Sequence, residues 1–284
     1  MSLVTTDHPG LTDPAYRARR AEIASIGESH RPGGAIPVVQ YTRDEDDLWM
    51  LVSRELAAKH RRDAVDVYLE GAEAVSLPAD RVPQLAWVSR RLTELTRFRI
   101  EPVPGLVPTR RFYGSLADRC FLSTQYVRHP SVPLYTPEPD VIHEVIGHAN
   151  QLGHPLFANL YEAMGRAVRR VESEEALDRL SRVWWFTLEF GLVREHGDVK
   201  TYGAGILSSF GELDAYRHAD IRPFDIDAMQ IQDYDISGVS GSVGALELSG
   251  PFHLTNDGTQ RAILEIGRAY KTNSRAGLLP NALL

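Results

Sequence analysis

The segment Tyr135-Thr-Pro-Glu-Pro-Asp-Val-Ile-His-Glu-Val-Ile-Gly-His148 places two histidines five positions apart, after a proline-rich entry. Proline is tolerated in a first helical turn, where its missing N–H would be unpaired anyway, so the segment predicts a helix start. Two imidazoles close in sequence can bind one metal ion, but positions five apart lie about 140° apart on an α-helix. A metal role therefore requires an irregular helix, or a His143 that lies just before the helix; otherwise the two histidines are unrelated.

A third ligand is expected from the aromatic segment Trp184-Trp-Phe-Thr-Leu-Glu-Phe-Gly191. On an α-helix Trp185 and Glu189 would share one face. A carboxylate among aromatic rings is costly to bury unless it meets a cation or a hydrogen-bond donor. That partner is either a metal ion or an arginine. Two histidines and one carboxylate leave open coordination positions, which favours non-haem Fe(II) over a closed structural zinc site.

Arg128 is a further candidate, in the segment Thr124-Gln-Tyr-Val-Arg-His129. Its planar guanidinium suits paired capture of a carboxylate, although a surface salt bridge is the simpler interpretation. Other catalytic motifs are missing. Gly203-Ala-Gly205 has Ser208 where a dinucleotide-binding motif needs its third glycine, and no Walker loop or Gly-x-Ser-x-Gly segment is present.

The composition indicates a soluble globular protein. Of 284 residues, 43% are hydrophobic and 24% are charged. No stretch reaches the roughly 20 apolar residues that a membrane helix needs, and the first residues lack the pattern of a secretory signal. The single Cys120 excludes an internal disulfide and predicts a cytoplasmic protein. The net charge of -7 argues against nucleic-acid binding.

The apolar periodicity predicts a mainly α (α+β) fold, a single helical domain with a few short strands. We divide the chain into an N-terminal arm, 1–37, that is mobile or laid over the surface, and one domain, 38–284. Asp80 is expected to cap one of the helices. Helices are predicted at 44–56, 64–75, 80–95, 156–171, 177–188 and 259–270, strands within 97–108 and 120–127, and a small-residue loop near 238–244.

Several segments occur together in the order of one known family. They are Val82–Leu85, Phe98–Leu106, Ser123–His129, Tyr135–His148, Trp185–Leu192 and Tyr202–Glu212. On these segments the chain resembles the pterin-dependent aromatic amino acid hydroxylases, in their short bacterial, phenylalanine-hydroxylase-like form. The similarity covers about residues 38 to 235. Joint occurrence of the last four segments is highly specific.

The resemblance implies that 38–284 is an iron-binding catalytic domain. Its Fe(2+) ligands would be His143, His148 and Glu189. The amino acid substrate would be held by Arg128 at its carboxylate, with Thr136 and Ser208 at the same end and Trp185 against the ring. The tetrahydropterin (tetrahydrobiopterin-like) would stack on Phe112, contact the backbone of Leu106 and Val107, and lie near Glu144.

The function implied is a monooxygenase that hydroxylates the ring of L-phenylalanine, or of L-tyrosine or L-tryptophan, with Fe(II), O2 and tetrahydropterin. Hydroxylation at the meta position is an alternative, because Leu122 and residues 238–251 depart from the family pattern near the pocket. A zinc hydrolase with Glu144 as general base and a non-catalytic amino-acid-binding homologue are rival hypotheses. The tail 276–284 lacks heptads, so a monomer or weak dimer is expected.

Overall fold

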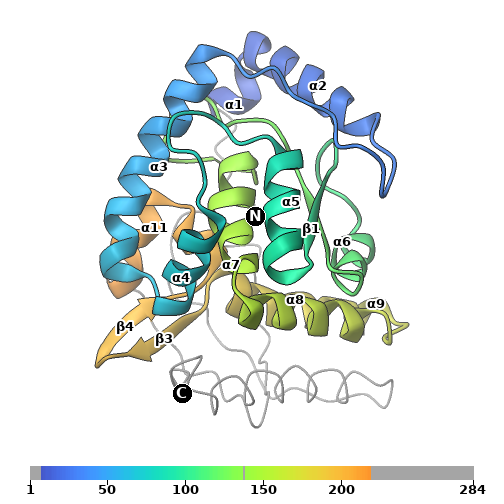
Figure 1. Cartoon of the computed structure of the whole chain (residues 1–284), viewed down its shortest axis with the longest axis vertical. Coiled ribbons are helices and arrows are strands. Elements are labelled where there is room, and N and C mark those ends of the chain that lie inside the picture. The colour runs from blue at the N-terminus through green and yellow to red at the C-terminus, as the bar shows by residue number, and fades with distance from the viewer. Residues whose placement is uncertain (1–7, 137, 219–284) are drawn as a thin grey trace.

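The computed structural model describes residues 8–136 and 138–218. In these ranges helices surround a central helical segment (Figure 1). Of the two small sheets, the β1–β2 pair is largely buried and the β3–β4 hairpin lies at the edge of the molecule (Figure 1). The mainly α fold with short strands is therefore confirmed. The predicted loop at 238–244 and helix at 259–270 lie outside the described residues.

Five of the predicted helices have counterparts at similar positions, in α3, α4, α5, α8 and α9, whereas helix α2 was not predicted. Two short π-helices, η1 and η2, interrupt the α-helical pattern. The elements in chain order are α1 (Pro9–Thr12), α2 (Pro14–Glu28), α3 (Arg43–Asp63), α4 (Asp66–Val75), α5 (Leu85–Thr96), β1 (Arg99–Pro102), α6 (Thr109–Leu116), β2 (Cys120–Ser123), η1 (His143–Ala149), α7 (Asn150–Leu152), α8 (Pro155–Val168), α9 (Glu174–Trp184), η2 (Trp185–Glu189), β3 (Leu192–Glu195), β4 (Asp198–Thr201), α10 (Ala204–Leu207), α11 (Phe210–Ala215) and the 3-10 turn η3 (Tyr216–His218).

Local hydrogen bonds decide where two of these helices begin. Thr42 and Glu45 form a reciprocal capping box at the start of α3. The predicted cap at Asp80 is wrong: α5 begins only at Leu85, after Gln84. The N–H of Val82 instead donates to Asp46 Oδ1 at 2.9 Å, so this connection is tied to α3 before α5 begins.

The two sheets have two strands each, and the strands of the β1–β2 sheet lead into loops that border the candidate metal centre described below. Strands β1 and β2 pair in parallel with Arg99 opposite Cys120, while β3 and β4 form an antiparallel hairpin. The chain leaves β1 into the loop 103–108 and leaves β2 into the segment 124–129. Because parallel strands end at the same edge, these two segments emerge side by side.

The centre of the core is formed by η1, α7 and α8, with α4 and α5 on either side of α7 (Figure 1). Val145, Ala149, Leu152 and Phe157 are completely buried there. Burial of this apolar surface is the main favourable term in folding. None of the helices in the described ranges is both long and apolar enough to span a bilayer.

The N-terminal residues 8–28 pack on the segment that follows β2. The hydroxyl of Tyr16 donates to Val127 O at 2.9 Å, and Arg20 donates to Tyr126 Oη at 3.1 Å and pairs with Glu138. Ile23 is buried against Tyr126 in a small separate cluster. Helix α2 thus contacts the connection that contains Arg128; the division of the chain at residue 37 stays a prediction.

Helices α6 and α8 approach each other closely at Gly165, and we expect a methyl group there to destabilise the fold. An added Cβ would lie 2.1 Å from Ala117 N. Gly165→Ala should lower the free energy of unfolding by about 1–3 kcal/mol, as overpacking does. The control is Gly114→Ala in α6, where an added Cβ would meet no atom within 4 Å. This variant should raise the free energy of unfolding by about 0.5–1 kcal/mol. Urea denaturation measures both; an equally stable Gly165→Ala would contradict the close packing.

Candidate metal centre and adjoining cavity

The two histidines lie on the π-helix η1, and this explains how residues five positions apart can face the same point. A π-helix forms hydrogen bonds between residues five apart, so such residues lie one above the other. The Nε2 atoms of His143 and His148 are 3.1 Å apart. The prediction of an irregular helix is therefore confirmed, and the alternative of two unrelated histidines is wrong.

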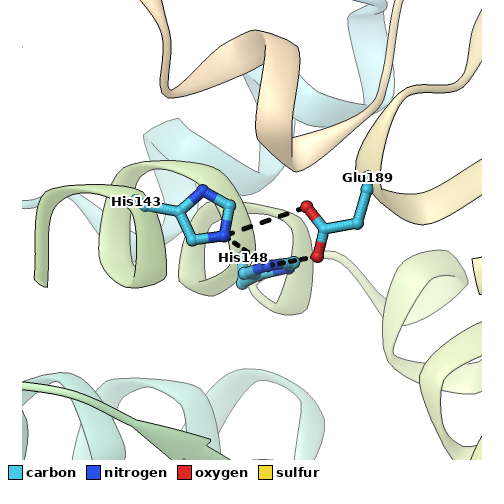
Figure 2. Close-up of side chains that lie close together, drawn as sticks. All are labelled: His143, His148 and Glu189. Atoms are coloured by element: carbon cyan, nitrogen blue, oxygen red, sulfur yellow. Dashed lines mark hydrogen bonds and ion pairs between the residues drawn. The ribbon is translucent and has the colours of Figure 1, made fainter. Parts of the chain in front are cut away.

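Glu189 meets both histidines from the second π-helix, η2. Its Oε1 lies 3.0 Å from His148 Nε2, and its Oε2 lies 3.8 Å from His143 Nε2. Figure 2 shows the carboxylate facing the two rings across the gap between the helices. The backbone of Glu189 is closely packed, since a Cβ on Gly203 would lie 2.3 Å from Glu189 O.

The hydrogen bond to Glu189 comes from Trp184, which α-helical geometry would place on a different face. Trp184 Nε1 donates to Glu189 Oε1 at 2.9 Å. Trp184 precedes Glu189 by five positions, which is the spacing that a π-helix aligns. Trp185 instead packs on Phe190, with ring centroids 4.8 Å apart. Trp185 and Glu189 nevertheless line one cavity, which agrees with the expectation that they share a face.

The outer nitrogen of each imidazole has a hydroxyl partner. His143 Nδ1 lies 2.7 Å from Ser208 Oγ, which itself donates to Gly205 O at 3.4 Å. His148 Nδ1 lies 2.6 Å from the hydroxyl of Tyr161. With Nδ1 engaged in this way, the Nε2 lone pairs are directed to the space between the three side chains, as metal-binding histidines require.

The charges at the cluster suit a cation. Burial lowers the pKa of His143 to about 4, so this imidazole is neutral near pH 7. Burial acts to raise the pKa of Glu189, but His148, His143 and the Trp184 hydrogen bond outweigh it and lower that pKa to about 2. Burial would lower the pKa of His148, yet the charge of Glu189 raises it. The ionised carboxylate thus favours positive charge between the rings.

The three side chains fit a divalent transition metal. Their ligand atoms all lie within 4.8 Å of one another. Two neutral nitrogens and one carboxylate oxygen are the ligand set of non-haem iron sites, which keep further positions for substrates. All three residues also line a cavity of about 190 Å³. A metal held here would therefore face that cavity and not the protein interior.

The cavity brings together the side chains that the sequence assigned to the pterin. Phe112, Leu106, Val107 and Glu144 all line it, and so does Trp185. Most of its other lining residues are apolar, including Leu122. Burial raises the pKa of Glu144 to about 8, so its carboxyl can carry a proton at neutral pH.

The residues assigned to the substrate carboxylate do not line this cavity. Arg128 is buried and pairs with Asp140 through Nε at 3.0 Å and Nη2 at 2.8 Å. The surface salt bridge considered for Arg128 is thus a buried pair. Thr136 Oγ1 donates to Glu138 O at 2.8 Å, and Ser208 contacts His143.

Asp140 is a site residue that sequence analysis assigned only to the helix entry. Its Oδ1 accepts the N–H of His143 at 3.1 Å, and its Oδ2 accepts the N–H of Arg128 at 2.8 Å. One buried carboxylate thus joins the arginine segment to the start of the histidine helix. The signal was its position before the helix, where aspartate commonly caps. Tyr161 and Gln151, beside His148, gave no signal of this kind.

Comparison with known proteins agrees with this geometry. The family description "Biopterin-dependent aromatic amino acid hydroxylase" matches residues 2–240. The chain belongs to the biopterin-dependent aromatic amino acid hydroxylases. This family assignment confirms the predicted enzyme class, a tetrahydropterin-dependent non-haem iron monooxygenase that acts on aromatic amino acids with dioxygen. It decides against the zinc hydrolase.

Three similar hydroxylases illustrate the match. Phenylalanine 3-hydroxylase of Streptomyces coeruleorubidus is 49% identical over 230 residues, 81% of this chain and 82% of that protein. Tyrosine 3-monooxygenase of Bos taurus is 43% identical over 80% of this chain, which spans about half (48%) of it. The phenylalanine hydroxylase structure of Chromobacterium violaceum, which has bound iron(III) and 7,8-dihydrobiopterin, is 28% identical with a TM-score of 0.68, covering 91% of this chain and 92% of that one.

The Arg128–Asp140 pair supports a prediction about this hydroxylase without its metal. Asp140→Ala should lower the free energy of unfolding by about 3–5 kcal/mol, because it leaves a buried guanidinium charge unpaired. Asp140→Asn keeps one acceptor oxygen and should cost less. Urea denaturation of the metal-free protein measures both. A loss below about 1 kcal/mol for Asp140→Ala would show that Arg128 does not depend on this partner.

Proposed function

We propose that this hydroxylase inserts one oxygen atom at carbon 3 of the ring of L-phenylalanine. The observation that carries the catalytic proposal is the convergence of His143, His148 and Glu189 at the wall of a largely apolar cavity. Support for the substrate and the ring position comes from the 49% identity to a phenylalanine 3-hydroxylase. Hydroxylation at carbon 4 is the second candidate, supported by 42% identity to a phenylalanine-4-hydroxylase of Dictyostelium discoideum.

The metal would be held by His143, His148 and Glu189. Bound iron and tetrahydropterin together supply the activation of dioxygen that ring hydroxylation requires. The chain would contribute two imidazole nitrogens and one ionised carboxylate, and the adjoining cavity would leave room for further ligands. Apolar walls exclude water, which limits loss of reactive species to side reactions.

The pterin would lie against Phe112, with Leu106 and Val107 contributing backbone contacts. Phe112 packs edge-on against Phe121 and Trp184, with centroids 5.5 and 5.8 Å away, so its ring is fixed before any ligand arrives. Glu144, with its raised pKa, can present a carboxyl proton to a polar edge of the pterin. A rigid aromatic surface with few polar groups is typical of cofactor sites.

The amino acid would be held at the Arg128 end. A guanidinium has five N–H donors, and Asp140 engages one edge through Nε and Nη2. We assign the other edge to the substrate carboxylate, with the hydroxyls of Thr136 and Ser208 at the same end. Trp185, which lines the cavity, would pack against the substrate ring. Pre-orientation by Asp140 reduces the entropy lost when substrate binds.

The remaining expectations concern the state of the protein in the cell. A single buried cysteine is consistent with a cytoplasmic protein. A monomer or weak dimer that binds neither nucleic acid nor membrane also stays a prediction.

The decisive experiment identifies the product. The full chain is incubated with Fe(II), tetrahydrobiopterin, air and each aromatic amino acid in turn, and products are separated by chromatography and mass. We expect 3-hydroxyphenylalanine from phenylalanine. Tyrosine as product would favour the carbon 4 alternative. Tetrahydrobiopterin oxidation that does not respond to any amino acid would support the non-catalytic homologue.

His143→Ala should abolish Fe(II) binding and product formation, because one of three ligands is removed. The expected loss of activity is at least about 1000-fold, and circular dichroism should show that the helices persist. Iron content after dialysis is the independent measurement. His154→Ala is a suitable control, since His154 is a cap at the start of α8 and lies outside the cluster. Turnover by His143→Ala would remove this residue from the ligand set.

Arg128→Lys should raise KM for the amino acid about 10- to 100-fold while Fe(II) affinity stays near wild type. Lysine is a point charge and cannot bind Asp140 and a substrate carboxylate through two planar edges. Arg166→Lys is the matched control, since Arg166 makes only an exposed pair with Glu162 among the described residues. Steady-state kinetics at several substrate concentrations measure the effect; an unchanged KM would assign Arg128 a structural role only.

A further inference from the structure

A buried chain of hydrogen bonds leads away from His148. The hydroxyl of Tyr161 lies 2.6 Å from His148 Nδ1 and donates to Gln151 Oε1. Gln151 Nε2 in turn donates to Leu188 O at 3.3 Å and to Tyr202 O. His148, Tyr161 and Gln151 are each at most 1% exposed. Water therefore has no access to replace any of these contacts.

The direction of each hydrogen bond in this series follows from its last members, the carbonyl oxygens of Leu188 and Tyr202. Backbone carbonyl oxygens only accept, so the amide of Gln151 must present its NH2 group to Leu188 and Tyr202. Its oxygen then faces Tyr161 and can only accept. The Tyr161 hydroxyl donates its proton to Gln151 Oε1, and the Tyr161 Oη accepts the hydrogen bond from His148 Nδ1–H. The proton of His148 is thus held on Nδ1, and Nε2 faces Glu189 and His143.

The same glutamine connects the two ligand segments. Gln151 lies in α7, directly after the π-helix that carries His148, whereas Leu188 directly precedes Glu189 in η2. A single side chain therefore fixes the imidazole proton and ties η1 to the backbone beside the carboxylate ligand. The ring of Tyr161 packs on Trp184, the donor to Glu189, with centroids 4.8 Å apart.

We propose that Tyr161 and Gln151 are positioning residues that fix the tautomer and orientation of His148 for metal binding. We call the hydrogen bonds from His148 through Tyr161 to Gln151 the relay. The carbonyls of Leu188 and Tyr202 fix the donor and acceptor direction of the relay, so this direction does not depend on solvent or on substrate. The proposal rests on the assignment of His148 as a metal ligand. Partners of this kind raise the basicity of a ligating imidazole, and their loss typically costs 10- to 100-fold in metal affinity.

The first test is Fe(II) affinity of the metal-free full chain, measured by competition with a chelator of known affinity. Tyr161→Phe removes only the hydroxyl and keeps the ring packed on Trp184. Its affinity should fall 10- to 100-fold. Gln151→Met should cause a similar loss, because the Tyr161 hydroxyl can then donate to His148 instead of accepting from it. The double variant should lose less than the product of the two single losses, as residues in one network do.

The matched control is Tyr216→Phe. Tyr216 is also completely buried, and its hydroxyl donates to Asp63 Oδ1 and Val199 O, outside the metal cluster. This variant should lose stability comparable to Tyr161→Phe in urea denaturation and keep wild-type Fe(II) affinity. Equal loss of affinity in both tyrosine variants would overturn the proposal, since general destabilisation would then explain it.

A spectroscopic measurement reports the tautomer directly. In Zn(II)-loaded protein labelled with 15N-histidine, His148 should show a protonated Nδ1 with a downfield proton resonance. In Tyr161→Phe this resonance should move upfield or broaden by exchange, whereas Tyr216→Phe should leave it unchanged. An identical His148 spectrum in wild type and Tyr161→Phe would overturn the relay.

The variant His148→Ala tests the assignment of His148 as a metal ligand separately from the role proposed for Tyr161 and Gln151. If His148→Ala keeps wild-type Fe(II) affinity, the ligand assignment is wrong and the relay is overturned with it. If His148→Ala loses binding while Tyr161→Phe and Gln151→Met retain full affinity, the metal site stands and only the relay is overturned. Loss in all three, with Tyr216→Phe unaffected, supports both.

Discussion

The i to i+5 hydrogen bonding of two short π-helices is the constraint on which the site depends. In η1 it aligns His143 with His148, and at η2 it aligns Glu189 with Trp184, the last residue of α9. On regular α-helices each pair would diverge by about 140°. Such widened turns are rare and occur mainly at functional sites, since the strain they introduce must be offset by packing elsewhere. Here the offset comes from a completely buried core around η1, α7 and α8.

Buried hydrogen bonds hold the site side chains in place around these two π-helices. Asp140 orients Arg128 and receives the first N–H of the histidine helix. Ser208 and Tyr161 contact the outer nitrogens of the two imidazoles. Each buried donor or acceptor left without a partner would cost about 1–3 kcal/mol, so these contacts rigidify the cluster before any metal binds. Rigid ligands are what precise placement of a small substrate beside a metal requires.

Much of this arrangement could be predicted from the sequence, and the exceptions have physical causes. The histidines and Glu189 were identified from residue type and order, and the cavity residue Phe112 was implied by the family resemblance. The hydrogen bond from Trp184 to Glu189 was not predicted, because 3.6 residues per turn would place these two side chains on different faces. The cap at Asp80 was wrong because a contact with α3 delays the helix. Gln151 was missed because its amide donates to backbone carbonyls, which no side-chain pattern marks. Tyr161 was missed because its side-chain partners, His148 and Gln151, come next to it only in the folded chain.

The close contact at Gly203 limits how this chain can change over evolutionary time. Any side chain there would displace the carbonyl of Glu189, because even a Cβ would lie well inside van der Waals distance of that oxygen. Leu122, by contrast, lines the cavity, where a side chain of different size alters the shape of the wall. Divergence in product can therefore accumulate along the cavity wall, while the glycine behind the carboxylate is held fixed by sterics alone.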